Sequence, residues 1–183
     1  MKKSLSKRKS PPKRTTAKRK TKPAKFSARI TLKRILVPVD FSDNSKKALR
    51  YAIPLAAQFK ASITVIYVVE PAVFPSDFGF GQMSFPDVEK EMYEKAEQEL
   101  KQLIEDLKSN VPLNAEVKSG IPFVEVTSYA DQENINLIVL ATHGRTGVEH
   151  ILFGSTAEKI IRKAPCPVLV VRAEEHEFVD DRV

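Results

Sequence analysis

The chain alternates between short apolar runs and longer segments with helical periodicity. The first run, residues 35–39, reads Ile-Leu-Val-Pro-Val; it is apolar throughout and does not alternate between apolar and polar residues. Continuous β-branched runs of this kind are typical of strands that are buried on both faces of a parallel sheet. Four more strands are predicted at residues 62–69, 115–119, 136–141 and 167–171. The pattern therefore predicts five strands.

The segments between these strands repeat their apolar residues every three or four positions, which indicates helices that bury one face. Helix-capping residues at 40–45 begin the first helix, and Pro54 lies inside it, where a proline is expected to kink or split a helix. A long helix is predicted over 87–109, and two shorter ones over 122–133 and 155–163. The apolar face of the long helix comprises Met92, Ala96, Leu100, Leu103, Ile104 and Leu107.

Strands and helices alternate along the chain, and no internal repeat is visible. We therefore expect an α/β fold with a single doubly wound five-stranded parallel sheet, a Rossmann-like arrangement, over residues 32–173. Ligands of such sheets bind beyond the carboxyl ends of the strands, where the strand order reverses. The segments expected near a site are therefore 40–45, 68–86, 120–122 and 141–156.

Charge divides the chain into three parts. The whole sequence has 30 Lys and Arg against 23 Asp and Glu, but residues 1–30 hold 13 of the basic residues and no acid. Residues 31–183 therefore carry a net charge of −6. We predict a disordered basic arm at residues 1–31, a folded acidic body, and an acidic tail at residues 174–183 with five acids and one Arg.

Composition excludes several classes of protein. A single cysteine, Cys166, excludes a disulfide framework and a multi-cysteine zinc site, and His150 and His176 lack the spacing of metal ligands. No apolar run approaches the roughly 18–20 residues that span a bilayer. The basic N-terminus lacks the apolar stretch of a secretory signal. We therefore expect a cytoplasmic protein without a membrane span or a resident metal site.

The residues after the fourth strand hold three of the six glycines and lead into a helix at Ser155. Glycines let backbone N–H groups approach a phosphate, and a helix N-terminus adds partial positive charge. Ser155 and Glu158 fit a capping box at that helix, and Arg145 adds a full charge. The segment is therefore a candidate anion site, with ordinary turn glycines as the alternative. It matches neither the Walker A loop nor the dinucleotide-binding glycine motif.

Two stretches of the chain resemble the universal stress protein family. Residues 35–45, ILVPVDFSDNS, are similar to the family's opening strand and helix start, and residues 137–171 to its closing strand, loop, helix and strand. The resemblance covers about residues 32–173. ATP-binding members carry G-x-x-G, nine residues, and then G-[ST]. Gly144 and Gly154-Ser155 keep that separation, whereas Ala141 stands in place of the first glycine.

The resemblance implies that the ligand is an adenine nucleotide, ATP with Mg²⁺. It implies that Pro38 and Asp40 lie beside the nucleoside and that the backbone of Val68 binds adenine. The residues that would surround the phosphates are Ala141, His143, Gly144, Arg145, Gly147, Gly154, Ser155 and Thr156. For Asp40 the residues alone leave open a simpler role as the cap of the helix that follows it.

Three hypotheses about function follow. The first is a homodimeric ATP-binding sensor or adaptor in the stress response. No nucleophile or general base is evident, so we expect no enzyme, although slow ATP hydrolysis or autophosphorylation stays open. The resemblance implies dimerisation through the last strand, Val168, Leu169, Val170 and Val171.

The second hypothesis is an adaptor of the same fold that does not bind ATP. Ala141, in place of the first glycine of the motif, keeps this hypothesis open. In the third, residues 1–30 bind nucleic acid without sequence preference; alternatively, this arm contacts the acidic body.

Overall fold

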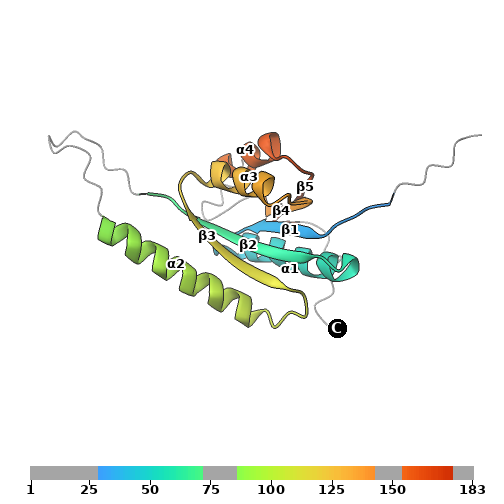
Figure 1. The fold of residues 1–183 in the computed structure, drawn as a ribbon, viewed down its shortest axis with the longest axis horizontal. Coiled ribbons are helices and arrows are strands. Elements are labelled where there is room, and N and C mark those ends of the chain that lie inside the picture. Colours follow the sequence, from blue (N-terminus) through green and yellow to red (C-terminus); the bar gives the residue numbers. More distant parts are fainter. Residues whose placement is uncertain (1–28, 72–85, 143–153, 175–183) are drawn as a thin grey trace, which may run out of the picture. The chain divides into compact units, whose positions relative to one another are not determined.

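A computed structural model describes residues 29–71, 86–142 and 154–174. Its five strands form one parallel sheet in the order β3-β2-β1-β4-β5 (Figure 1). The elements are β1 (Arg34–Pro38), α1 (Asp43–Phe59), β2 (Ser62–Val69), α2 (Pro86–Asp106), β3 (Leu113–Ser119), α3 (Pro122–Gln132), β4 (Leu137–Ala141), α4 (Ser155–Lys163) and β5 (Val168–Val171). The predicted doubly wound α/β sheet with five parallel strands is confirmed.

Helices cover both faces of the sheet. Helices α1 and α2 lie on one face, and α3 and α4 on the other (Figure 1). Alternate residues of β1 enter opposite layers, so that Val37 packs in the α1–α2 layer and Leu36 in the α3–α4 layer. β1 lies between β2 and β4, and the chain reverses its direction of winding there. The carboxyl ends of β1 and β4 therefore frame the place where such sheets bind ligands.

Helix α1 is continuous through Pro54, so of the two expected effects, a kink or a split, the split is excluded. Proline removes the N–H that would bond to the carbonyl of Arg50, four residues earlier. Both Pro54 and Arg50 are exposed, so water can take the place of the lost partner. The helix ends where Lys60 takes a left-handed conformation and its N–H donates to the carbonyl of Ala56.

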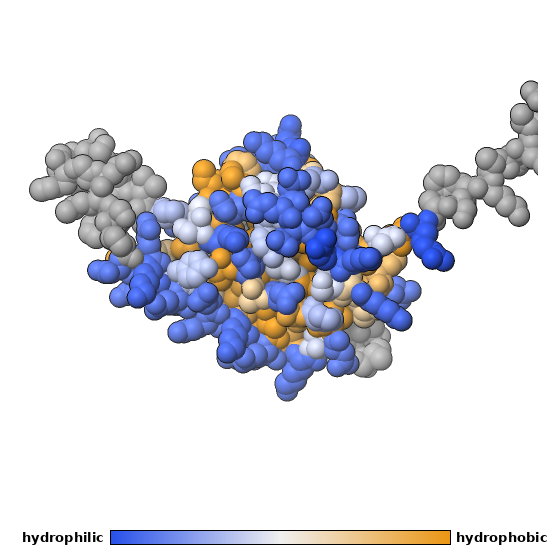
Figure 2. All heavy atoms as spheres, viewed as in Figure 1, coloured by the Kyte–Doolittle hydropathy of each residue, from blue (hydrophilic) through white to orange (hydrophobic). Residues whose placement is uncertain are grey.

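Helix α2 packs through Ala96 and Leu100, which are buried, and through the half-buried Leu103 and Ile104; Leu107, directly after the helix, is half-buried against the same core. The prediction that Met92 belongs to this face is wrong, because Met92 is 41% exposed and the neighbouring Tyr93 turns toward the sheet. Hydrophilic residues dominate the outer side of α2 (Figure 2). Among the helices of the described ranges, α2 included, none is long and apolar enough to cross a membrane.

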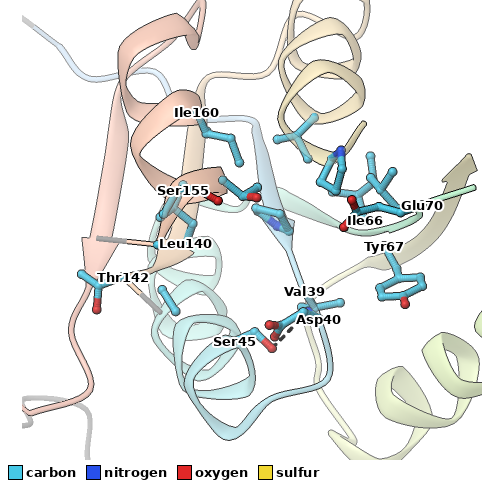
Figure 3. A pocket seen from close by; sticks show the side chains of 18 residues that line it. Val39, Asp40, Ser45, Ile66, Tyr67, Glu70, Leu140, Thr142, Ser155 and Ile160 are labelled. Carbon is cyan, nitrogen blue, oxygen red and sulfur yellow. Dashed lines mark hydrogen bonds between the residues drawn. The ribbon is translucent and has the colours of Figure 1, made fainter. Parts of the chain in front are cut away.

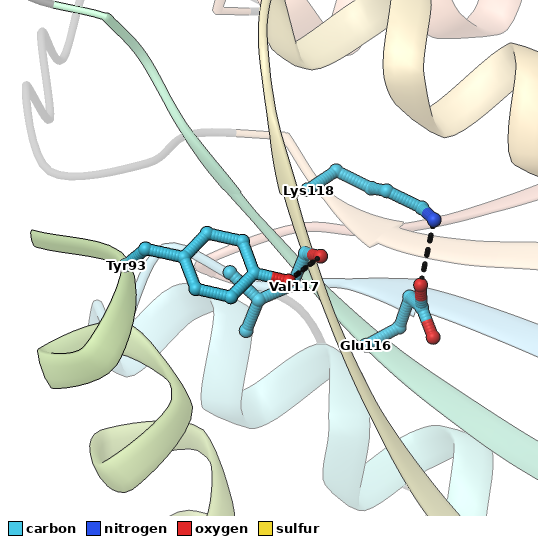
Figure 4. A network of polar contacts seen from close by, with 4 residues as sticks. All are labelled: Tyr93, Glu116, Val117 and Lys118. Atoms are coloured by element: carbon cyan, nitrogen blue, oxygen red, sulfur yellow. Dashed lines mark hydrogen bonds and ion pairs between the residues drawn. The ribbon is translucent and has the colours of Figure 1, made fainter. Parts of the chain in front are cut away.

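Tyr93 protects one edge of the sheet. The N–H of Ile63 donates to the carbonyl of Pro112, and the N–H of Gly120 donates to that of Val69, so the backbone of Val117 between them points away from β2. The Tyr93 hydroxyl donates to this outward Val117 carbonyl over 2.9 Å (Figure 4). Exposed strand edges invite pairing with other chains. Helix α2 thus occupies part of the β3 edge.

A polar pair lies on the other face of β3. Lys118 Nζ is 2.8 Å from a carboxylate oxygen of Glu116 (Figure 4) and 5.7 Å from the centroid of the Tyr129 ring. The hydrogen bond to Glu116 raises the pKa of Lys118. Both side chains are partly exposed, so the pair contributes little to stability. The charges serve mainly to keep this uncovered part of the sheet polar.

Gly120, between β3 and α3, occupies a position that requires glycine. Its φ is +149°, and an added Cβ would lie 2.7 Å from a carboxylate oxygen of Glu125. We expect Gly120→Ala to lower the free energy of unfolding by about 1–3 kcal/mol, as other strained backbone positions do. Gly154→Ala is the matched control, because Gly154 has φ −63° and an added Cβ would lie at an ordinary contact distance of 3.5 Å from the Thr142 carbonyl. Urea unfolding of the three proteins tests this; equal midpoints would contradict it.

Candidate functional site

A cleft of about 370 Å³ opens at the carboxyl ends of β1, β2 and β4, against the first turn of α4 (Figure 3). Seven of the eleven predicted site residues line it together: Pro38, Asp40, Val68, Ala141, Gly154, Ser155 and Thr156. The other four, His143, Gly144, Arg145 and Gly147, lie outside the described residues. Segments that are far apart in the sequence thus meet at the predicted point of strand reversal.

Asp40 follows β1 and is tied to the start of α1. Its Oδ1 accepts hydrogen bonds from the Ser42 hydroxyl (2.6 Å) and the Ser42 N–H (3.1 Å). Its own N–H donates to the Ser45 hydroxyl, the contact drawn in Figure 3. The cap of α1 is Ser42, whose hydroxyl accepts from the Ser45 N–H. The alternative that Asp40 itself caps the helix is therefore wrong, and its carboxylate faces the cleft from a fixed position.

Phe41 supports this corner from behind. It has a positive φ of 63°, unusual for a large side chain, and its ring lies 4.7 Å from that of Tyr67 at an angle of 41°. Tyr67 lines the cleft, whereas Phe41 packs against the core beneath it. The contact between these two rings thus supports the backbone turn between β1 and α1, where Asp40 lines the cleft.

The end of β2 presents backbone groups to the cleft. In the described chain, the last hydrogen bond from the β1 segment to β2 joins the Val39 N–H to the Ile66 carbonyl over 2.9 Å. Val68 lies two residues further along the same side of β2, past the end of β1. Its N–H and C=O therefore point beyond the strand pairing, at the cleft that Val68 lines.

Helix α4 brings its N-terminus to the opposite wall. The cap is Gly154, which forms no side-chain capping bond, and its N–H donates to the carbonyl of Thr142 over 2.8 Å. The predicted capping box is wrong, because Ser155 is already the first helical residue and Glu158 pairs with Arg162 one turn later. Gly154 has no side chain with which to cap the first N–H groups of α4, and the exposed Ser155 and Thr156 stand beside those groups.

Several lining residues were not among those predicted, including Tyr67, Glu70 and Pro122. Glu70 follows β2 directly and adds a second carboxylate on the side of Asp40 (Figure 3). Pro122 begins α3 and closes the cleft from above the sheet. A sequence signal did exist for Glu70 and Pro122, since each lies in a segment that follows a predicted strand, but only the order of the strands in the sheet says which of those segments meet.

Of the remaining chemical candidates, the described Cys166 does not line the cleft, whereas His150 and His176 lie outside the described residues. Cys166 is half-buried at the start of β5 among the residues of the α3–α4 layer, and burial raises the pKa of its thiol, which makes it less reactive at neutral pH. Across the three described ranges, no group of three or more His, Cys, Asp and Glu side chains could hold a metal ion.

Sheet order, cleft position and helix N-terminus define a doubly wound α/β protein with an open cleft at its topological switch point. A profile of the universal stress protein family matches residues 31–172, and the chain belongs to this family. Universal stress protein MJ0531 of Methanocaldococcus jannaschii is 36% identical over 148 residues, which cover 79% of this chain and 85% of that protein. The structure of universal stress protein UspA from Lactobacillus plantarum superposes with a TM-score of 0.67 at 28% identity, covering 79% of this chain and all of that one.

Two more distant solved structures share the fold and contain nucleotides. One is a universal stress protein in complex with cAMP, 19% identical, with a TM-score of 0.57 over 79% of this chain and all of that one. The other, from Archaeoglobus fulgidus, is in complex with dAMP, 22% identical, with a TM-score of 0.52 over 77% of this chain and 98% of that one. At these identities the likeness concerns the fold alone.

Proposed function

We propose that this chain binds an adenine nucleotide, ATP together with Mg²⁺, in the cleft at the ends of β1, β2 and β4. The observation that carries the proposal is the polarity of the cleft. Two carboxylates, Asp40 and Glu70, stand on one side, and the N-terminus of α4, whose cap residue Gly154 has no side chain, stands on the other. A ligand with hydrogen-bond donors at one end and an anionic group at the other fits this arrangement, and a nucleotide has both.

The phosphate end belongs at α4. Backbone N–H groups and the helix dipole favour negative charge there, and the hydroxyls of Ser155 and Thr156 add donors. Gly154 supports the same reading, since neither its φ of −63° nor crowding by the described chain demands glycine. A ligand that lies close to the backbone here would require glycine at this position, because any side chain would occupy its space.

The nucleoside end belongs at β1 and β2. The N–H and C=O of Val68 form a donor–acceptor pair that suits the edge of adenine, and the Asp40 carboxylate can accept from an amino group or a ribose hydroxyl. Mg²⁺ would be bound mainly by phosphate oxygens and water, as is usual for this ion. That family relatives have been crystallised with cAMP and dAMP supports an adenine nucleotide as the ligand class.

In the cell, this protein would act as a homodimeric sensor or adaptor in the stress response rather than as an enzyme. The alternative is an adaptor of the same fold that does not bind ATP. Ala141, which replaces the first glycine of the family motif, lines the cleft and adds a methyl group there. Native mass spectrometry of freshly purified protein separates the two, because it reports retained nucleotide and dimer mass together. An adduct-free dimer that also fails to bind added ATP would favour the alternative.

The edge at β5 is the candidate dimer contact. The N–H groups of Ile138 and Thr142 in the β4 segment donate to the carbonyls of Pro167 and Val171, so the backbones of Val168 and Val170 point outward. In a two-fold antiparallel pairing, Val168 of one copy can lie opposite Val170 of the other and exchange hydrogen bonds. Leu169 and Ile161, each 37% exposed, add apolar surface from the strand and from α4.

The basic arm suggests a second partner. Residues 1–30 hold 13 Lys and Arg and no acid, whereas the remaining chain has a net charge of −6. We expect deletion of residues 1–30 to leave the melting temperature of the body nearly unchanged. We also expect it to abolish binding to random duplex DNA, which in the full chain should fall by orders of magnitude between about 50 and 200 mM salt.

A filter-binding titration at two salt concentrations tests this. The matched control keeps the length of the arm but replaces its Lys and Arg residues by Gln, and should behave like the deletion. Equal binding by the full and truncated chains, or no binding at low salt, would remove nucleic acid as a partner of the arm.

A further inference from the structure

Phe41 takes a conformation that a large L-residue rarely adopts, directly beside a residue of the cleft. Its φ of 63° lies in the left-handed region, which is unfavourable for residues other than glycine. Such a conformation persists only where surrounding contacts hold it. The contact here is the ring of Tyr67, 4.7 Å away between centroids.

This conformation determines where the Asp40 carboxylate lies. Oδ1 of Asp40 accepts the N–H of Ser42 over 3.1 Å, and this bond closes a small ring of atoms in which Phe41 is the central residue. The Ser42 hydroxyl donates to the same oxygen over 2.6 Å. A change in the φ of Phe41 would therefore move the carboxylate relative to α1 and to the cleft.

We propose that Phe41, clamped by Tyr67, is the positioning residue that holds the Asp40 carboxylate against the nucleoside end of the ligand. The inference rests on the proposed nucleotide binding and adds a residue that does not itself line the cleft. Phe41 acts through Asp40, so its effect on affinity should exist only while Asp40 can accept a hydrogen bond as a carboxylate. The ligand group concerned is a donor, a ribose hydroxyl or an adenine amino group.

A double-mutant cycle tests the proposal. Calorimetry with Mg²⁺ and ATP compares the wild type, Phe41→Leu, Asp40→Ala and the double variant. We expect Phe41→Leu and Asp40→Ala each to weaken ATP binding roughly tenfold, as the loss of one hydrogen bond to a charged group does. In the Asp40→Ala background, which has no side-chain acceptor to position, Phe41→Leu should have no further effect. A purely structural role would instead weaken binding equally in both backgrounds, and that result would overturn the proposal.

Two more variants control for folding. Phe41→Gly accepts a positive φ without strain, so it should fold while losing the ring contact, and it should show the same tenfold loss. Phe59→Leu makes the same substitution as Phe41→Leu at the far end of α1, away from the cleft, and should bind ATP like the wild type. Unchanged ATP affinity of both Phe41 variants would overturn this inference alone. A wild type that binds no ATP would overturn the proposed function as well.

Discussion

Gly154→Val is expected to abolish measurable ATP binding while the protein stays folded. The backbone at Gly154, with φ −63° and ψ 151°, is accessible to any residue. An added Cβ would meet only the Thr142 carbonyl within the described chain, at an ordinary contact distance of 3.5 Å. The branched side chain would occupy the space where phosphate is proposed to meet the first N–H groups of α4. Loss of two hydrogen bonds to a charged group lowers affinity about 100-fold or more.

Gly154→Ala makes this experiment sharper. One methyl group should weaken ATP binding less than valine does. In the free protein the restriction of the unfolded chain by alanine, about 0.4–1 kcal/mol, is opposed by the poorer fit of alanine at the N-cap, so the free energy of unfolding should change by less than about 1 kcal/mol. Calorimetry with Mg²⁺ and ATP, paired with thermal unfolding without nucleotide, separates the two effects. Equal ATP affinity of the wild type and Gly154→Val would refute the assignment of this site.

Val170→Pro is expected to convert a dimer into monomers with little damage to the fold. The Val170 N–H points away from β4, so proline removes a donor from the open edge and leaves the β4–β5 hydrogen bonds in place. In a two-fold dimer each copy loses one hydrogen bond, and the loss of two raises the dimer dissociation constant about 10- to 100-fold. A steric clash of the proline ring with the partner would raise it further. Sedimentation velocity over a range of concentrations measures this.

Two variants bracket the result. Val170→Thr keeps the outward N–H and the branched shape, so it should remain dimeric. Leu169→Pro removes an N–H on the side of β4, so it should lower the melting temperature in addition to any effect on assembly. A monomeric wild type at micromolar concentration, or a Val170→Pro variant as dimeric as the wild type, would argue against β5 as the contact.

The fold could be predicted from the chain because its inner strands, β1, β2 and β4, are buried on both faces. The continuous run from Ile35 to Val39 allows few interpretations other than an inner strand of a parallel sheet, and the alternation with helices then restricts the topology. The errors came from single positions. Met92 and Tyr93 are adjacent on α2, and a rotation of about 100° per residue decides which of them packs inward.

The candidate site could be predicted in part, for a related reason. Asp40 follows a strand, Val68 lies near the end of one and Gly154 directly precedes a helix, so their place at the carboxyl edge of the sheet is visible in the chain. Glu70 and Pro122 also lie at that edge, but their closeness to Asp40 depends on β2 lying beside β1. The Ser155 capping box failed because a glycine directly before it takes the cap position, which the spacing of Ser and Glu does not reveal.

The Tyr93 contact on β3 bears on how far assembly can proceed. Two copies joined at β5 would form one continuous sheet whose outermost strands are both β3. At each end, Tyr93 already occupies an outward carbonyl of that strand, and α2 lies beside it. Addition of a third copy would have to displace this contact at each new junction. Assembly would therefore stop at two copies. The β5 edge would be available for pairing, whereas the contact of Tyr93 with the β3 edge would oppose open-ended polymerisation.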